Sequence, residues 1–174
     1  DWSPDGQRLL ISASRDPSEY GLDVYEVDLA GGTPRRITRD GGRDASYAPD
    51  GRTIVYVRGF NTLFQDDYAG AANYDVYVTD VDGAVPRRLT DTPGNEMNPC
   101  VSADGQTVWC LAEVKGYYNV VAVPLHAVPG EGQGGKPVTS WTDDNARRAS
   151  LAWDRKTLAF EKDGRLVAVD LTAA

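Results

Sequence analysis

The chain has 174 residues, of which 18 are Lys or Arg and 26 are Asp or Glu, giving a formal net charge of −8. This acidic balance argues against nucleic acid as the main ligand, because phosphate binding needs a clustered positive surface. No apolar run is long enough to span a bilayer, and no signal peptide is recognisable. No stretch has sustained helical periodicity bounded by caps, so we expect an all-β chain.

A short phrase recurs four times at intervals of about fifty residues, at 2–6, 47–51, 101–105 and, in altered form, 151–155. The first copy reads Trp-Ser-Pro-Asp-Gly, in which proline and aspartate suit a type I turn and glycine takes the left-handed conformation that closes a hairpin. Each phrase therefore predicts a hairpin with a three-residue loop. Because Arg155 stands where glycine is needed, the last hairpin is a candidate for another turn type.

Three strands are predicted in each repeat. The first follows the phrase, at 8–12, 53–57, 107–111 and 157–161. The second is at 22–29, 74–81, 118–123 and 165–171. The third contains a proline, at 33–38, 85–90 and 136–139, and so belongs at the outer edge of the sheet. With the strand that precedes each phrase, every repeat is a four-stranded antiparallel unit.

Four-stranded units that recur about every 40 to 55 residues are typical of β-propeller blades. The phrases place the blades at about 1–39, 40–91, 92–142 and 143–174 of a single domain. The first copy opens at the end of an inner strand and the last stops before a fourth strand. We therefore expect an all-β partial β-propeller of about three and a half blades, cut from a longer protein. Its uncovered faces predict self-association or reliance on missing blades.

Motifs for catalysis are missing from the sequence. The single histidine, His126, is expected in an exposed loop, and no nucleophile elbow, phosphate loop or zinc motif is present. Acidic clusters at 66–75 and 143–145 lack the spacing of a calcium loop and are interpreted as solvated loops. We assign no catalytic residue, metal or cofactor, and leave open whether the parent protein is an enzyme.

Two further features have structural interpretations. The arginine pairs at 35–36, 87–88 and 147–148 are interpreted as solvated charges on outer strands. Cys100 and Cys110 flank the third phrase, and a register that places Cys100 opposite Val108 sets the thiols diagonally on one face, far for a disulfide. We expect two buried free thiols.

Residues 58–73 form a longer connection than their counterparts, rich in aromatic, amide and acidic side chains. In a propeller, such a loop and the connections between blades emerge on one face, opposite the hairpin phrases, and loops on a rigid scaffold commonly carry recognition. The alternative is that the insertion only covers the blade. The candidate binding residues on this rim are Asn61, Phe64, Asp66, Asp67, Tyr68, Asn73, Asn95, Glu96, Tyr117 and Arg147.

The repeated phrase, the Asp-Val-Tyr strand at 75–77 and the Arg-Arg-Leu-Thr strand at 87–90 resemble the TolB-type propeller blade, over essentially the whole chain. Finer features look like the N-terminal six-bladed propeller of tricorn-type serine peptidases, at 68–77, 89–96, 118–125 and 139–148. This resemblance implies a non-catalytic module that binds or gates peptide or protein substrates. Nothing matches the peptidase domain, so no active-site residue is carried over.

Two other hypotheses share the same blade. One is a TolB-like protein–protein interaction propeller of the cell envelope, and the other is the propeller of a prolyl-oligopeptidase- or amidohydrolase-type hydrolase. The partner is a peptide or a protein in each case. The resemblance favours a periplasmic or secreted location over a cytoplasmic one.

Overall fold

The computed structural model describes residues 1–14, 21–59, 73–128 and 134–173. The first sheet contains β1 (Arg8–Ala13), β2 (Asp23–Asp28) and β3 (Arg35–Arg36). The second contains β4 (Arg43–Tyr47), β5 (Thr53–Arg58), β6 (Asp75–Asp80) and β7 (Arg87–Arg88). The third contains β8 (Glu96–Val101), β9 (Thr107–Val114), β10 (Tyr117–Pro124) and β11 (Lys136–Pro137). The fourth contains β12 (Arg147–Leu151), β13 (Thr157–Lys162) and β14 (Arg165–Asp170), followed by a 3₁₀ turn at Leu171–Ala173.

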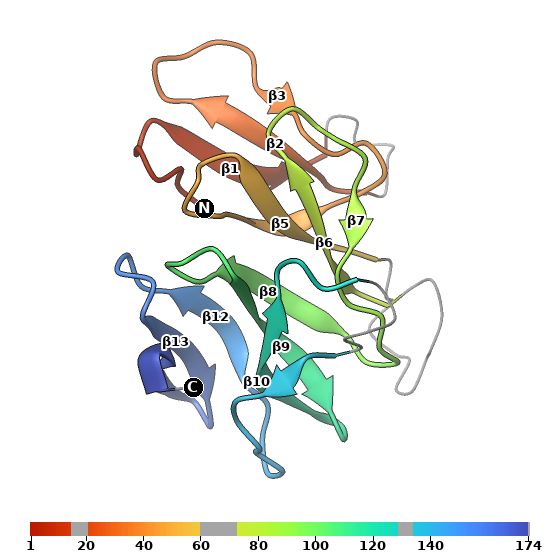
Figure 1. Cartoon of the computed structure of the whole chain (residues 1–174), viewed down its shortest axis with the longest axis vertical. Helices are drawn as coiled ribbons and strands as arrows, with labels where there is room; N and C mark the ends of the chain where they lie inside the picture. The colour runs from red at the N-terminus through yellow and green to blue at the C-terminus, as the bar shows by residue number, and fades with distance from the viewer. Residues whose placement is uncertain (15–20, 60–72, 129–133, 174) are drawn as a thin grey trace.

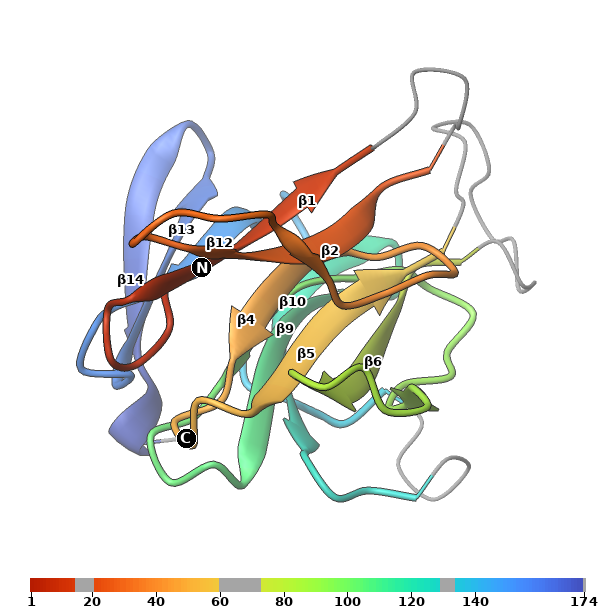
Figure 2. The same cartoon turned by 90° about the horizontal axis from the view of Figure 1, so that it is seen from above.

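Within these described residues, the strands form four separate antiparallel sheets, which are propeller blades (Figure 1). The strands that precede the phrases, β4, β8 and β12, are inner strands, and β4 and β12 both lie beside β8 (Figure 2). The two-residue strands β3, β7 and β11 lie at sheet edges, as their prolines predict. The prediction of an all-β partial propeller is confirmed. In this part of the chain, no helix is long and apolar enough to cross a membrane.

The core lies between successive sheets. Leu10, Tyr47 and Tyr56 are buried between the first two blades, whereas Val55 faces Val101 between the second and third. Neighbouring residues of β5 thus point to opposite faces, and both faces are covered, which explains the uninterrupted apolar run in this strand. Each fully buried Val or Leu contributes about 1.5–3 kcal/mol, so packing between blades holds the arc together.

All four hairpin phrases adopt the same turn. The N–H groups of Gly6, Gly51, Gly105 and Arg155 donate to the carbonyl three residues earlier, at 2.8–3.0 Å. Arg155 has the left-handed φ of 55°, close to the 67–72° of the three glycines. The expectation of a different last turn was therefore wrong. The loop length also differs from the prediction, because Ser3 pairs with Arg8 and four residues lie between them.

Contacts along the central axis explain why an arginine holds this strained position. Arg155 Nη1 donates to the carbonyls of Tyr47 at 3.0 Å and Val101 at 2.9 Å, at the ends of β4 and β8. The left-handed conformation costs about 1–2 kcal/mol for a residue with a Cβ. Hydrogen bonds from a charged donor contribute about 1.5–3 kcal/mol and offset it. Arg155 therefore joins three inner strands.

Most arginines of the repeated pairs are not solvated edge charges, which corrects the sequence interpretation. Arg36 pairs with the buried Asp23, Arg35 Nη2 lies 2.6 Å from Glu26, and Arg88 Nη2 lies 2.8 Å from Asp75. Arg87 donates to two carbonyls of the third blade. The pair at 147–148 belongs to the inner strand β12 rather than to an outer strand, and it is exposed. Arg35, Arg36 and Arg88 lie against carboxylates of their own blades, because buried carboxylates need cationic partners.

The two cysteines are buried and free, as predicted. The register was wrong by one residue, since Cys100 lies opposite Trp109. A bulge at 98–99 shifts the pairing of β8 relative to β9 beyond this point. Burial raises the pKa of Cys100 to about 12, and that of Cys110 well above its ordinary value.

Replacing Arg155 with Ala should lower the free energy of unfolding by about 2 kcal/mol, because two carbonyls at the axis lose a charged donor while the left-handed conformation stays. Arg155→Gly should cost less, because glycine adopts this φ without strain. Urea unfolding measures both. Arg52→Ala is the matched control, because Arg52 follows the second phrase and pairs at the surface with Asp82; it should change stability by less than about 0.5 kcal/mol. An equal loss from Arg52→Ala would refute a special role for Arg155.

Neither thiol of the folded chain should react with a disulfide reagent at pH 8, because each is buried and only the thiolate attacks. Both should react at once in denaturant. The absorbance of the released thiol, measured before and after denaturation, checks this expectation. Rapid labelling of the native chain at one site would contradict the packing described around Cys100 or Cys110.

Candidate functional site

A threonine clamp shapes the rim face of each of the first three blades. The backbone N–H groups of Val24, Val76 and Val120 donate to threonine hydroxyls at 2.9 Å, namely Thr38, Thr90 and Thr139. In the first and third blades, that hydroxyl donates at 3.0 Å to the residue that precedes the valine, Asp23 or Asn119. The clamp fixes the outer segment of each blade against the strand that carries the valine, which is β2, β6 or β10, next to the rim loops.

The second blade departs from this pattern. Here the hydroxyl of Thr90 donates to Glu96 Oε2 at 2.9 Å, and Thr92 donates to the other oxygen of Glu96. Asp75, the counterpart of Asp23, keeps Arg88 at 2.8 Å. Its Oδ1 atom is buried and receives no hydrogen bond from another described residue when Glu96 is ionised. The blade therefore buries two carboxyl groups where the first and third blades place one acceptor.

Glu96 occupies an equivalent position to Gly42 and Ala146. The N–H groups of these three residues donate to the carbonyls of Tyr74, Leu22 and Tyr118, respectively, at 2.7–3.1 Å. A Cβ at Gly42 would lie 2.9 Å from Thr38 Oγ1, so the first clamp leaves no room for a side chain. Of these three equivalent positions, that of Glu96 carries a carboxyl group, and this group is completely buried.

Burial dominates the electrostatics of this pair. Desolvation raises the pKa of Glu96 to about 7, against the opposing hydrogen bonds from Thr92 and Thr90. Desolvation likewise raises the pKa of Asp75 to about 6, against the pairing with Arg88. Glu96 lies within hydrogen-bonding reach of Asp75. A proton shared between the two carboxyls supplies the donor that Asp75 Oδ1 otherwise lacks.

A cavity of about 740 Å³ opens beside this pair, on the rim face between the first two blades. We call it the rim groove; its lining includes Leu22, Asp40, Arg43, Arg58, Tyr74, Asp75, Tyr77 and Arg88. The Arg43 guanidinium lies 3.9 Å from the centre of the Tyr74 ring, and that of Arg58 lies 5.5 Å from Tyr77. These contacts hold two cations in place beside aromatic faces.

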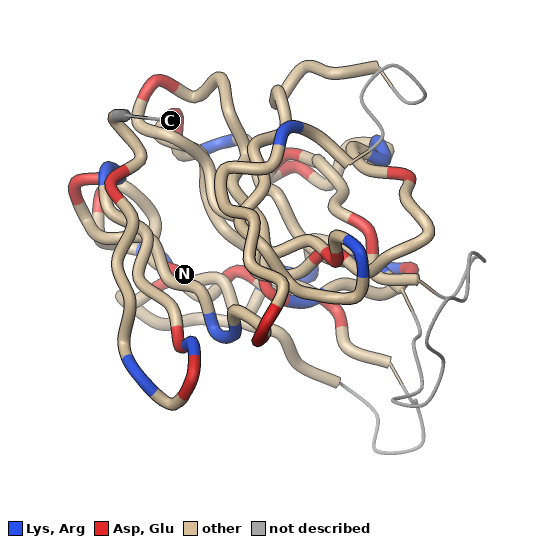
Figure 3. Tube along the Cα trace, turned by 90° about the horizontal axis from the view of Figure 1, so that it is seen from below, with Lys and Arg blue, Asp and Glu red and all other residues tan. Residues whose placement is uncertain are grey.

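The rim groove suits binding rather than catalysis. Guanidinium groups bind carbonyl and carboxylate oxygens, and tyrosine rings pack against flat or apolar groups. The described lining contains no serine, cysteine or histidine, so it lacks a nucleophile paired with a base. Acidic and basic positions are interspersed along the described trace (Figure 3).

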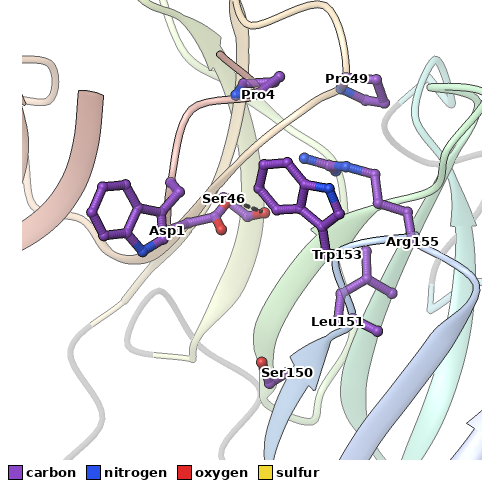
Figure 4. A pocket seen from close by; sticks show the side chains of 10 residues that line it. Asp1, Pro4, Ser46, Pro49, Ser150, Leu151, Trp153 and Arg155 are labelled. Carbon is purple, nitrogen blue, oxygen red and sulfur yellow. Dashed lines mark hydrogen bonds between the residues drawn. The ribbon is translucent and has the colours of Figure 1, made fainter. Parts of the chain in front are cut away.

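A second cavity, of about 410 Å³, lies on the opposite face, where the hairpin phrases meet. We call it the axial cavity; Pro4, Pro49, Leu151, Trp153 and Arg155 are among its lining residues (Figure 4). Trp153 is 79% exposed, which is unusual for a tryptophan. This cavity offers apolar contacts around the guanidinium that joins the inner strands.

The predicted rim residues divide into three groups. Asn61, Phe64, Asp66, Asp67 and Tyr68 lie outside the described residues. Asn73, Asn95 and Glu96 come together between the second and third blades. Asn73 donates to the carbonyl of Pro93 at 2.6 Å, and Asn95 accepts from the N–H of Tyr74 at 3.1 Å. Asn73 lines the rim groove although it is largely buried, whereas Glu96 is completely buried and a role for it in binding is indirect.

Tyr117 and Arg147 lie apart from this group, at the starts of β10 and β12. Arg147 is exposed and lines a separate cavity of about 420 Å³. In the acidic segment at 143–145, Asp143 pairs with Lys162 at 3.1 Å, and Asp144 accepts from the N–H of Asp163 at 2.7 Å. Both carboxylates thus make contacts within the chain. No group of three potential metal ligands occurs within the described residues.

Sequence reasoning missed the rim groove residues Arg43, Arg58, Tyr74 and Tyr77. Each lies in or beside a predicted strand, and nothing in a period-2 pattern distinguishes a tyrosine between blades from one that lines a groove. The available signal was the coincidence of arginine or tyrosine at strand ends that meet on one face.

The chain resembles two curated proteins over 62% of its length. An uncharacterized protein of Agrobacterium fabrum, Atu1656, is 30% identical over 109 residues, which are 33% of its length. YuxL, an uncharacterized peptidase of Bacillus subtilis, is 26% identical over 112 residues, or 16% of its length. The chain thus matches a third or less of each relative. No model of a known protein family matches the sequence.

Solved structures show the same fold. Putative TolB from Agrobacterium tumefaciens superimposes with a TM-score of 0.76 and 22% identity, over 98% of this chain and 60% of that one. TolB from Acinetobacter baumannii gives 0.73 and 19%, over 99% and 40%. Tricorn protease gives 0.57 and 17%, over 99% and 21%. The chain therefore has the TolB-like propeller fold, which the tricorn structure shares.

Proposed function

We propose that this chain is a non-catalytic propeller module that binds peptide segments in the rim groove, within a larger hydrolase of the tricorn-like peptidase kind. The single observation that carries the proposal is the pairing of Arg43 with Tyr74 and of Arg58 with Tyr77 in that groove. Held cations and aromatic faces fit the alternating carbonyls and side chains of an extended peptide. Similarity to the peptidase YuxL and to tricorn protease supports a hydrolase as the parent.

The lining of the groove also favours peptide over other ligands. Its lining comes from the first two blades and combines three arginines with two tyrosines and the exposed Leu22. Small-molecule sites are usually more apolar and enclosed. Binding here leaves the chemistry to a different domain, and the rim loops steer or admit the substrate.

A second function is favoured by a different observation. The axial cavity presents the exposed Trp153, and large exposed aromatic side chains are common anchors at protein interfaces. The two TolB structures also superimpose on this chain with higher TM-scores than tricorn protease does. On this alternative, the chain is an interaction propeller of the cell envelope that docks a protein segment in the axial cavity, in a periplasmic or secreted setting.

Short unstructured peptides labelled with fluorescein should bind the full chain, as measured by anisotropy. The double substitution Arg43→Gln with Arg58→Gln should weaken that binding about tenfold, or by about 1.4 kcal/mol, because both held cations lose their charge. Arg52→Gln removes an exposed cation on the hairpin side and is the matched control. Trp153→Ala separates the two candidates, since it lowers affinity only when the axial cavity is the site. If no peptide binds, or the double variant binds as the wild type does, the rim groove proposal fails.

A further inference from the structure

The carboxyl pair of the second blade is the one place in the described residues where the threonine clamp is built around two buried acids. Asp75 is 3% exposed and Glu96 0% exposed. Arg88 is the guanidinium bonded to the pair, through Asp75 Oδ2 at 2.8 Å, and it divides its charge with Asp91, also at 2.8 Å. One shared cation does not neutralise two buried anions, and burying an unpaired charge is costly. Protonation of one carboxyl removes this excess of negative charge.

The same pair holds the loop that connects the second and third blades. Glu96 accepts from Thr90 and Thr92, and Thr92 Oγ1 accepts from the N–H of Gly94 at 3.2 Å. At the other side of the loop, Asn73 donates to the carbonyl of Pro93. A change in the charge or position of Glu96 is thus transmitted directly to residues 92–95.

The neighbours of the pair offer little compensation for a second negative charge. Titratable or charged groups from each element packed around it are Arg43 of β4, Tyr77 of β6, Arg88 of β7, Asp91 after β7, Cys110 and Glu113 of β9, and Tyr118 of β10. Of these, Asp91 and Glu113 are acidic, Arg88 is already bonded to Asp75 and Asp91, and Arg43 packs its guanidinium on the Tyr74 ring at 3.9 Å. Ionisation of both carboxyls therefore adds repulsion that these cations offset only in part.

We propose that Asp75 and Glu96 act as a proton-dependent latch, which holds the rim loop at residues 92–95 closed while at least one of them is protonated and loosens it when both ionise. The latch works on the fold itself and does not require that the rim groove bind peptide. The first and third blades lack it, because Gly42 and Ala146 stand where Glu96 does.

The direction of the pH effect follows from the two titrations. Both groups have folded-state pKa values, about 6 and about 7, above their ordinary values. Their contribution to stability is complete below the unfolded values near pH 4 and is lost as the pH rises through 6 and 7. The latch is therefore closed in mildly acidic solution and released above neutrality.

The test is amide hydrogen exchange of the full chain between pH 5 and pH 8, with Glu96→Gln as the main variant. Gln keeps the shape of the protonated acid and cannot ionise. After correction for intrinsic exchange, protection of the amides of Thr92, Gly94 and Asn95 in the wild type should fall about tenfold or more from pH 5 to pH 8, and it should stay level in the variant. The equivalent loop at 141–146, where Asn145 accepts from the N–H of Tyr118 at 2.7 Å, is the internal control and should show no such change.

A second variant keeps the test decisive if Gln is not tolerated. Glu96→Ala reproduces the residue at position 146 and should also remove the pH dependence, with lower protection at every pH. The same pH profile in the wild type and either variant overturns the latch. Calcium that restores protection in the wild type at pH 8, but not in Glu96→Gln, would assign the pair to a cation instead of a proton and would also overturn it.

Discussion

A threonine hydroxyl just beyond each of the outer strands β3, β7 and β11 is the contact on which the rim face depends. The outer strands β3, β7 and β11 have two residues each, which is too few to hold them on β2, β6 and β10 by backbone pairing alone. Thr38, Thr90 and Thr139 supply the acceptor that Val24, Val76 and Val120 would otherwise lack. A buried N–H without an acceptor costs about 1–3 kcal/mol. The threonine hydroxyl therefore stabilises the start of β2, β6 or β10, where the valine lies. The loops that follow take their positions from it.

The two departures from the repeat differ in their physical consequences. Arg155 replaces a glycine at a strained φ, but its guanidinium finds two carbonyls at the axis, so the strain is offset within the fold. Glu96 replaces Gly or Ala at a buried position and brings a charge that the site cannot neutralise without a proton. The first departure adds rigidity. The second makes one loop sensitive to its surroundings, and such local conflicts are typical of functional positions.

The sequence predicts the blade because its signals are local. Turn residues, period-2 strands and edge prolines all act within a few positions. The strands lie within one or two residues of their predicted bounds, except that β9 runs on to Val114, beyond the predicted end at 111. The hairpin loop has four residues instead of three whether or not its first position carries a hydroxyl, since Ser3 pairs with Arg8 and Ala48 pairs with Thr53 in the same way. A hydrophobic pattern does not record how many residues such a turn contains.

Contacts between residues far apart in the sequence were beyond such reasoning. Arg36 and its partner Asp23 are separated along the chain, and only the pairing of β2 with β3 brings them together. The rim groove needs more, because Arg43 and Tyr74 meet only once the relative positions of three strands are known. Glu96 was predicted as a rim residue from its place in a loop, but its burial depends on the clamp. Long-range geometry therefore decides the chemistry, while local pattern decides the scaffold.

Asp75 and Arg88 belong to both the latch and the rim groove, and this shared membership couples the two. An anionic group that binds in the groove and draws Arg88 toward itself leaves Asp75 with less positive charge, so the pair holds its proton more tightly. Because linkage is reciprocal, protonation of the pair must then strengthen the binding of that anion. The direction is opposite for a cationic ligand, which favours the ionised pair. The sign of proton uptake on binding thus reports the charge of whatever occupies the groove.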